Sequence, residues 1–238
     1  MKKILLSALI ISSAFSGNFG IDIALIGQLP KGEFKDEGVP TGFGLDINGL
    51  WYPSKQFGLG LNVGISQYGN SERQIPFSYY TDLVTITEKT TNDLAYSHLL
   101  LKLIPFQGNV RPYFEGLLGM KNLFTSTKVI SENCPEEDED TCEIASSTNY
   151  SDNAFSYGGG GGLEITLTSF GGDEDSGIKG VLSFFINARY MIGAEAEYLK
   201  EGAITFSDPQ DGPVQTTFDP STSKTDVLQI NLGLNFNF

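Results

Sequence analysis

The sequence predicts an all-β fold, an eight-stranded antiparallel up-and-down transmembrane β-barrel with short periplasmic turns and longer extracellular loops. Three observations predict it. The last eleven residues alternate strictly between apolar and polar or glycine positions, the pattern of a strand with one apolar face. Seven earlier segments alternate in a similar way, and the connections between them are alternately short and long. Aromatic residues gather at both ends of the segments, as two membrane interfaces would select.

The chain begins with a segment typical of an exported protein. Lys2 and Lys3 precede a mostly apolar stretch over 4–15, and Ala14 and Ser16 give small residues at the positions that a signal peptidase reads. We expect residues 1–16 to be a signal peptide and residues 17–238 to form the barrel domain. The apolar stretch is shorter than the about 20 residues that a transmembrane helix needs.

Composition narrows the class of protein further. The net charge of −14 argues against a nucleic-acid partner, because phosphate binding needs clustered Lys and Arg. The 28 Gly, 17 Phe and 10 Tyr favour strands and tight turns over helices. A mean hydropathy of −0.09 is compatible with a membrane barrel, because only alternate residues of each strand meet lipid.

Each predicted strand is a run in which positions of one parity are apolar. The first run alternates Phe19 and Ile21 with Gly20 and Asp22, and the last has its apolar residues at every even position up to Phe238. The predicted strands are, in order, 19–25, 43–51, 57–65, 95–105, 113–124, 155–167, 182–190 and 228–238. At about 3.3 Å per residue, a tilted strand of roughly 9–11 residues crosses a bilayer core.

The connections alternate in length as they do in bacterial barrels. Turns are predicted at 53–56, 106–112 and 168–180, and longer polar loops at 30–42, 67–92, 125–153 and 193–225. With the N-terminus in the periplasm, one outward belt of aromatic residues falls at the periplasmic end: Phe19, Trp51, Phe57, Phe114, Phe236 and Phe238. A second belt falls at the opposite end: Phe43, Phe124, Phe155, Tyr157 and Tyr190.

With these features the chain resembles the small eight-stranded outer-membrane barrels of Gram-negative bacteria, the OmpA/OmpX/OmpW type. The resemblance is carried by the signal sequence, the segment Pro112–Gly119 (PYFEGLLG), the Ala188-Arg-Tyr190 segment and the terminal Phe238. It implies a location in the cell outer membrane and contact with the lipid bilayer and lipopolysaccharide. It also implies insertion by the barrel-assembly machinery through the C-terminal strand, and a monomeric barrel. The chain ends at the barrel, so the peptidoglycan-binding domain of full-length OmpA is not implied.

The inward positions of the predicted strands carry charge. The expected luminal polar network contains Asp22, Asp46, His98, Lys102, Glu115, Lys121, Glu164 and Arg189, with amides such as Asn48, Asn62, Gln229 and Asn231. Buried charges must be paired, so the first interpretation is a plugged interior held by ion pairs. The alternative is a narrow hydrophilic path, helped by small residues at Gly58, Gly60, Gly64, Gly158, Gly160 and Gly162. These glycines are equally suited to bending the strands.

The two cysteines and the only histidine are the residues that could carry chemistry. Cys134 and Cys142, the only cysteines, flank a run of acidic residues, and in an exported protein they predict a disulfide rather than a zinc site. The acidic run leaves calcium binding open, although its spacing is not that of an EF-hand. His98, the only histidine, could serve as the base of a lipid-modifying enzyme. However, no serine and acidic residue have the spacing of a catalytic triad with it, and no GxSxG motif occurs.

The sequence therefore predicts a non-catalytic outer-membrane protein with a structural or surface-interaction role carried by its extracellular loops. It predicts no cofactor, no resident metal and no catalytic residue. A narrow porin-like channel for small solutes is the main alternative, and a lipid-modifying enzyme is a weaker one.

Overall fold

The computed structural model describes residues 18–78, 81–131, 142–170, 179–200, 202–206 and 216–238. The predicted signal peptide at 1–16 lies outside these residues and stays a prediction. In the described part of the chain, no helix has the length and apolar character needed to cross a membrane.

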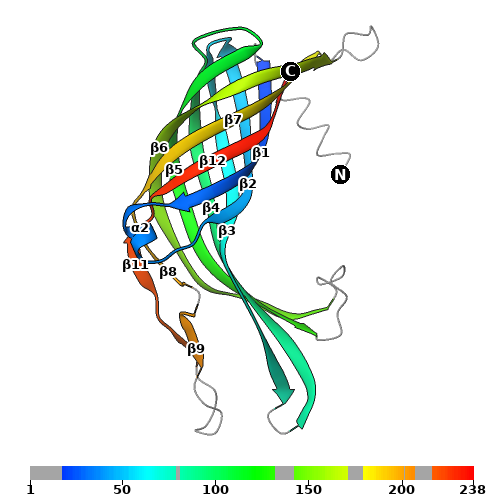
Figure 1. Ribbon diagram of the computed structural model, residues 1–238, viewed down its shortest axis with the longest axis vertical. Coiled ribbons are helices and arrows are strands. Elements are labelled where there is room, and N and C mark those ends of the chain that lie inside the picture. Colours follow the sequence, from blue (N-terminus) through cyan, green and yellow to red (C-terminus); the bar gives the residue numbers. More distant parts are fainter. Residues whose placement is uncertain (1–17, 79–80, 132–141, 171–178, 201, 207–215) are drawn as a thin grey trace.

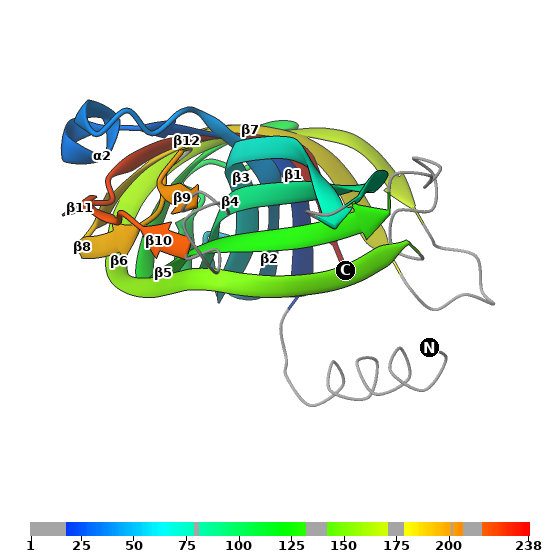
Figure 2. The same cartoon turned by 90° about the horizontal axis from the view of Figure 1, so that it is seen from below.

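Eight strands close into an antiparallel barrel (Figure 1), which confirms the predicted fold class. They are β1 Asn18–Pro30, β2 Gly42–Ser54, β3 Phe57–Ser78, β4 Thr81–Leu103, β5 Val110–Ser131, β6 Glu143–Phe170, β7 Gly180–Gly193 and β12 Val227–Asn237. Each strand pairs with its neighbour along the barrel, and β12 pairs back to β1 with Leu234 opposite Ile23. The end-on view in Figure 2 shows the strands as a curved wall around an interior.

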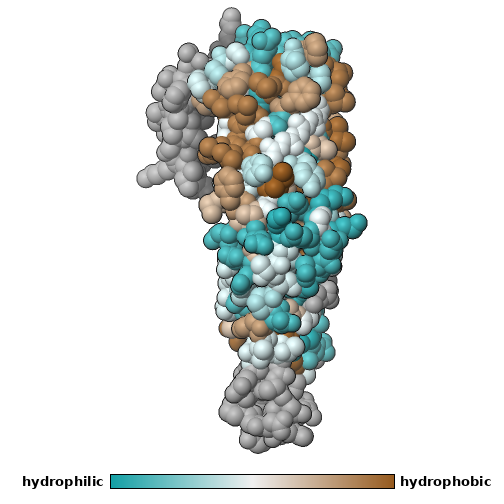
Figure 3. Space-filling model, turned by 90° about the vertical axis from the view of Figure 1, so that its left-hand side faces the viewer, coloured by the Kyte–Doolittle hydropathy of each residue, from teal (hydrophilic) through white to brown (hydrophobic). Residues whose placement is uncertain are grey.

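The outer surface of the barrel is apolar, the reverse of a soluble protein. Leu25 is 68% exposed, Leu99 63% and Leu61 57%. Their neighbours along the strands, such as Ile26 and Leu100, point inward and are buried. A contiguous exposed apolar surface of this kind is matched to lipid. Figure 3 shows hydrophobic residues gathered over the part of the molecule drawn uppermost and hydrophilic residues below it. The barrel is therefore a transmembrane barrel with a distinct apolar band.

The two ends of the barrel differ. At one end, the turn end, short connections join β2 to β3 and β4 to β5, and both Asn18 and Phe238 lie there. At the opposite end, the loop end, the strands β3 to β6 continue far beyond the apolar band (Figure 1). In bacterial barrels the short turns face the periplasm and the longer connections face the outside.

The prediction of loops over 67–92 and 125–153 is wrong, because most of these residues continue the strands. Pairing runs out to Ser78 opposite Thr81 in one hairpin and to Ile130 opposite Glu143 in the next. Polar residues occupy both faces along most of these extensions, so they lack the apolar alternation that reveals a membrane strand. The result is a four-stranded sheet, here called the projecting sheet. Ten residues of β3, 69–78, carry it roughly 30 Å beyond the band at about 3.3 Å per residue.

The other two long connections also contain structure. The first holds a short helix, α2 (Gly32–Asp36). The last contains β8 (Glu195–Tyr198) paired with β11 (Ser221–Lys224), and β9 (Ile204–Phe206) paired with β10 (Thr216–Phe218). Both connections lie at the loop end, beside the base of the projecting sheet (Figure 1).

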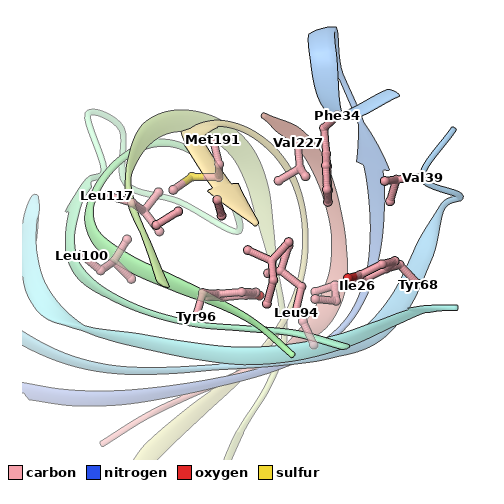
Figure 4. Packing of buried hydrophobic residues seen from close by; sticks show 14 of the residues in the cluster. Ile26, Phe34, Val39, Tyr68, Leu94, Tyr96, Leu100, Leu117, Met191 and Val227 are labelled. Carbon is pink, nitrogen blue, oxygen red and sulfur yellow. The ribbon is translucent and has the colours of Figure 1, made fainter. Parts of the chain in front are cut away.

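An apolar cap fills the loop end of the barrel. We use this name for Ile26, Phe34, Tyr68, Leu94, Tyr198 and Val227, which are all buried. The Phe34 ring of α2 meets the rings of Tyr198 and Tyr68 edge to face, with centroids 5.1 and 6.1 Å apart. Figure 4 shows Ile26, Leu94 and Val227 directed into the ring of strands close to Phe34. Burial of these side chains shields the interior from the outside medium.

Candidate functional site

The structure places all eight predicted luminal residues inside the barrel. Asp46, Lys102, Lys121, Glu164 and Arg189 are 0% exposed, and the remaining three are at most 6% exposed. Neighbouring strands bring them together because inward positions alternate along every strand. Six of them form two clusters of ion pairs, while Lys121 and His98 have no ion pair with either cluster.

The first cluster is centred on Lys102 of β4. Its Nζ lies 3.6 Å from an oxygen of Asp22 and 3.4 Å from an oxygen of Glu164, and it stands 4.3 Å above the centre of the Tyr113 ring. Arg111 forms a second ion pair with Glu164. Asp22 also accepts a hydrogen bond of 3.2 Å from Asn48. Each charge in this cluster has a partner of opposite sign, which offsets the cost of burial.

The second cluster is centred on Arg189 of β7. Its Nε donates to Glu115 at 2.7 Å, and its Nη1 lies 3.3 Å from both oxygens of Asp46. Asp46 also accepts hydrogen bonds of 2.6 Å from the hydroxyl of Tyr96 and from the amide of Asn62. The guanidinium thus ties β7 to β5 on one side and to β2 across the interior on the other.

Sequence reasoning missed Arg111, which completes the charge balance of the lumen. The sequence assigns it to a turn, whereas it lies on β5 and its side chain is 17% exposed. With Arg111, four bases face the four acids of the interior: Lys102, Arg111, Lys121 and Arg189 against Asp22, Asp46, Glu115 and Glu164. The available signal was parity, since Arg111 shares the odd positions of the inward residues Tyr113 and Glu115.

The lone histidine belongs to the structural interior. His98 is 1% exposed; its Nδ1 lies 3.2 Å from Oδ1 of Asn62, and its ring centre is 5.3 Å from that of Tyr96. Lys121 reaches across the lumen and donates to the backbone oxygen of Thr225 at 2.8 Å. Lys121 therefore fixes the start of the closing strand rather than pairing with a carboxylate.

Three of the luminal glycines, Gly58, Gly64 and Gly162, make room for tyrosines, whereas Gly60, Gly158 and Gly160 lie against the backbone of a neighbouring strand. A Cβ on Gly64 would overlap the ring of Tyr96, one on Gly58 would lie 2.9 Å from the ring of Tyr52, and one on Gly162 would lie 2.8 Å from the Tyr113 ring. The volume that the missing side chains leave is thus filled by aromatic side chains. The glycine pattern is explained by packing and strand curvature.

Apolar side chains fill the rest of the interior, and sequence reasoning missed them as well. Leu50, Leu100, Leu117 and Phe185 point inward and are at most 4% exposed. Each lies next to outward apolar residues, as in the run Leu99-Leu100-Leu101, so both faces of the strand are apolar there. Period-two alternation cannot assign a face in such a run.

The predicted periplasmic aromatic belt lies at the turn end. Phe114 is 61% exposed and Phe238 is 45% exposed, and the other four members, Phe19, Trp51, Phe57 and Phe236, are half-buried. The Phe238 ring also contacts Phe170 edge to face at 6.0 Å. This arrangement suits a membrane interface.

The predicted disulfide and the acidic run lie largely outside the described residues, because Cys134 and positions 132–141 are not described. The pairing of Cys134 with Cys142 stays a prediction, as does the open question of calcium binding. Within the described ranges, no group of three or more His, Cys, Asp or Glu side chains is arranged to hold a metal ion.

Comparison with known proteins gives matches only to solved structures. No family model and no curated protein sequence matches the chain. Ail, the attachment invasion locus protein of Yersinia pestis, is 15% identical over 94% of this chain and 100% of that chain, with a TM-score of 0.39. Neisserial surface protein A is 10% identical over 93% and 98%, with a TM-score of 0.40. The outer membrane protein OprG of Pseudomonas aeruginosa is 13% identical over 94% and 96%, with a TM-score of 0.41. Identity and TM-score are low in all three matches, so the assignment of the fold rests on the strand pairing itself.

Proposed function

We propose that this protein is a non-conducting, non-catalytic barrel of the bacterial outer membrane that presents its projecting sheet for contact at the cell surface. The observation that carries the proposal is the combination of a filled lumen with a long paired sheet outside the membrane. Insertion by the barrel-assembly machinery, contact with lipopolysaccharide and a monomeric state are part of the same proposal.

The filled lumen supports a role that does not involve transport. The charged side chains at the centre of both clusters are buried, since Asp46, Lys102 and Arg189 have no exposed surface, and the apolar cap closes the loop end above them. A water-filled path would leave such side chains partly exposed. An eight-stranded barrel is just wide enough for side chains to fill it.

The enzyme alternative lacks the geometry that it needs. A barrel that acts on lipids must present its base to the bilayer or to an opening, because the ester bond lies there. His98 faces the lumen, is 1% exposed and contacts an amide and a tyrosine ring. Its position supports a structural role.

The projecting sheet supports a surface role. Beyond Gln67, β3 has no partner on its β2 side, because the β2–β3 ladder ends with Phe43 opposite Gln67. The two central strands, β4 and β5, remain paired out to Ile86 opposite Ser131. A barrel without a surface role would not need strands that extend this far, and exposed rigid elements are well suited to recognition.

Planar-bilayer recording tests the filled lumen. We expect the refolded full chain to give no discrete conductance steps, because buried side chains of the two clusters occupy the described part of the lumen. Folding is checked beforehand by the difference in gel mobility between heated and unheated samples. Reproducible single-channel steps from the folded protein would refute the non-conducting proposal and favour the porin-like alternative.

Shortening the hairpin tests the surface role. Asn70 and Thr91 are register partners, so residues 71–90 can be replaced by an Asn-Gly turn without breaking the ladder below. Bacteria that display the intact chain are expected to adhere to cell layers or matrix-coated wells several-fold more than bacteria that display the shortened chain. Equal adherence at equal surface amounts would refute the surface role.

A further inference from the structure

Two cavities of mixed polar and apolar lining meet at the base of the projecting sheet, on the face of the sheet that continues the barrel lumen. The larger, about 400 Å³, is lined by the segment after α2 (Glu37–Pro40), by Tyr68 and Gly69 of β3, by Asn92 of β4 and by Lys200. Its volume falls within the roughly 300–1,000 Å³ of small-molecule sites. The smaller, about 80 Å³, lies further out along the sheet, and the two share Asn92 and Lys200.

Asn92 is held in one orientation between the two cavities. It is 4% exposed, and its Oδ1 accepts a hydrogen bond of 2.7 Å from Thr125. Its Nδ2 lies over Gly69, where an added Cβ would come within 2.6 Å of it. Gly69 therefore leaves space for this amide, and the bond from Thr125 leaves the nitrogen as a donor on the cavity side.

The charges around the two cavities cancel. Lys200 and Glu37, which both line the larger cavity, form an ion pair of 2.9 Å. Arg73 and Glu88 line the smaller cavity, and Arg73 donates to both oxygens of Glu88 at 3.1 and 2.8 Å. A hydrogen bond from Lys200, together with its charge, holds the pKa of the Glu37 carboxyl below its usual value, so this pair stays ionised at neutral pH. A cation would meet Lys200 and Arg73, and an anion would meet Glu37 and Glu88 as well as the chain's net charge of −14.

The lining groups that remain are hydroxyls and small apolar groups. Ser71, Thr90 and Thr125 line the smaller cavity with Ile204, and Val39 and Pro40 line the larger one. A sugar ring carries adjacent hydroxyls that both donate and accept, beside a C–H surface that packs on apolar side chains. Planar amides and ion-paired side chains bind such hydroxyls in pairs.

We propose that these cavities form an extracellular binding site for an uncharged saccharide, with Asn92 as its central donor. This inference rests on the proposed surface role and adds the chemical class of the ligand. The saccharide could come from a facing cell surface or from the bacterium's own outer leaflet, and both sources offer the same chemistry.

Saturation-transfer NMR on the full chain in detergent micelles tests the site. The probes are glucose, galactose, N-acetylglucosamine and lactose, with N-acetylneuraminic acid and glucosamine as charged counterparts. We expect at least one uncharged probe to bind and both charged probes to bind at least tenfold more weakly. The proposal is overturned if no uncharged probe binds, or if a charged probe binds as well as the best uncharged one.

Variants locate the binding. Asn92→Asp keeps the size of the side chain and its bond from Thr125 but removes the donor, and we expect about tenfold weaker binding. Thr91→Ala, on the opposite face of the same strand, is the matched control and should bind as the parent does. Equal binding by Asn92→Asp and the parent overturns the site, and folding of each variant is verified by gel mobility.

The adherence assay then separates the two proposals. Adherence that depends on residues 71–90 while no uncharged sugar binds overturns the saccharide site but not the surface role. Inhibition of adherence by the bound sugar supports the site and identifies the facing surface as the source. Sugar binding without such inhibition supports the site and identifies the outer leaflet.

Discussion

Replacing Arg189 with Met is expected to lower the free energy of unfolding by about 3–5 kcal/mol, the cost of leaving buried charges without their partner. Arg189 is 0% exposed and is the cation that contacts both Glu115, at 2.7 Å, and Asp46, at 3.3 Å. Without it, two carboxylates remain inside a low-dielectric lumen. Urea titration of the barrel in lipid vesicles, followed by Trp51 fluorescence, measures the loss.

A triple variant is the matched control for this prediction. Arg189→Met combined with Asp46→Asn and Glu115→Gln removes all three charges together, and it should recover most of the stability that the single variant loses. If the single variant is as stable as the parent, the second cluster does not hold the barrel together. If the triple variant is no better than the single one, lost packing rather than charge explains the effect.

Adding one methyl group at Gly160 is expected to prevent folding or to destabilise the barrel by at least about 3 kcal/mol, the upper end for overpacking. A Cβ at Gly160 would overlap the backbone oxygen of Ala188 and lie 2.8 Å from the Cα of Arg189. Both are backbone atoms of the adjacent strand β7, so they cannot move without breaking the β6–β7 ladder. The folded fraction of Gly160→Ala, measured by gel mobility after refolding, tests this.

Gly116→Ala is the control on the outer face. A Cβ there meets no atom within 4 Å, because the position faces lipid. Its stability should stay within about 0.5 kcal/mol of the parent, as for other exposed substitutions. If both alanine variants fold equally well, the curvature of β6 does not depend on glycine at its inner face.

Both substitutions, at Arg189 and at Gly160, probe how side chains fill the lumen. Four basic and four acidic side chains face the lumen, and tyrosines occupy the space at Gly58, Gly64 and Gly162. The barrel wall continues into the projecting sheet, with the two cavities at its base.

Sequence reasoning worked where each strand has one apolar and one polar face. Lipid on one side and a polar interior on the other impose strict alternation, so parity alone assigned Asp46, Glu115 and Arg189 to the inside. It failed at Leu100 and Phe185, where both faces are apolar, and over 67–92, where both faces are polar. In each case successive side chains still point to opposite faces of the strand, but they do not differ in polarity, so the sequence does not reveal the two faces.

The sequence alone determined that this is an eight-stranded transmembrane barrel and which residues of most strands face its interior, because the bilayer requires alternation along every strand. Only the tertiary structure decided which charges pair, that Arg111 pairs with Glu164, and that tyrosines fill the space at Gly58, Gly64 and Gly162. These contacts join residues far apart in the sequence, such as Asp46 of β2 and Arg189 of β7, which meet across the lumen. The alternation of polarity within a strand determines whether each side chain faces lipid or the lumen. Which side chains meet across the barrel depends on the order and register of the strands, which only the closed fold supplies.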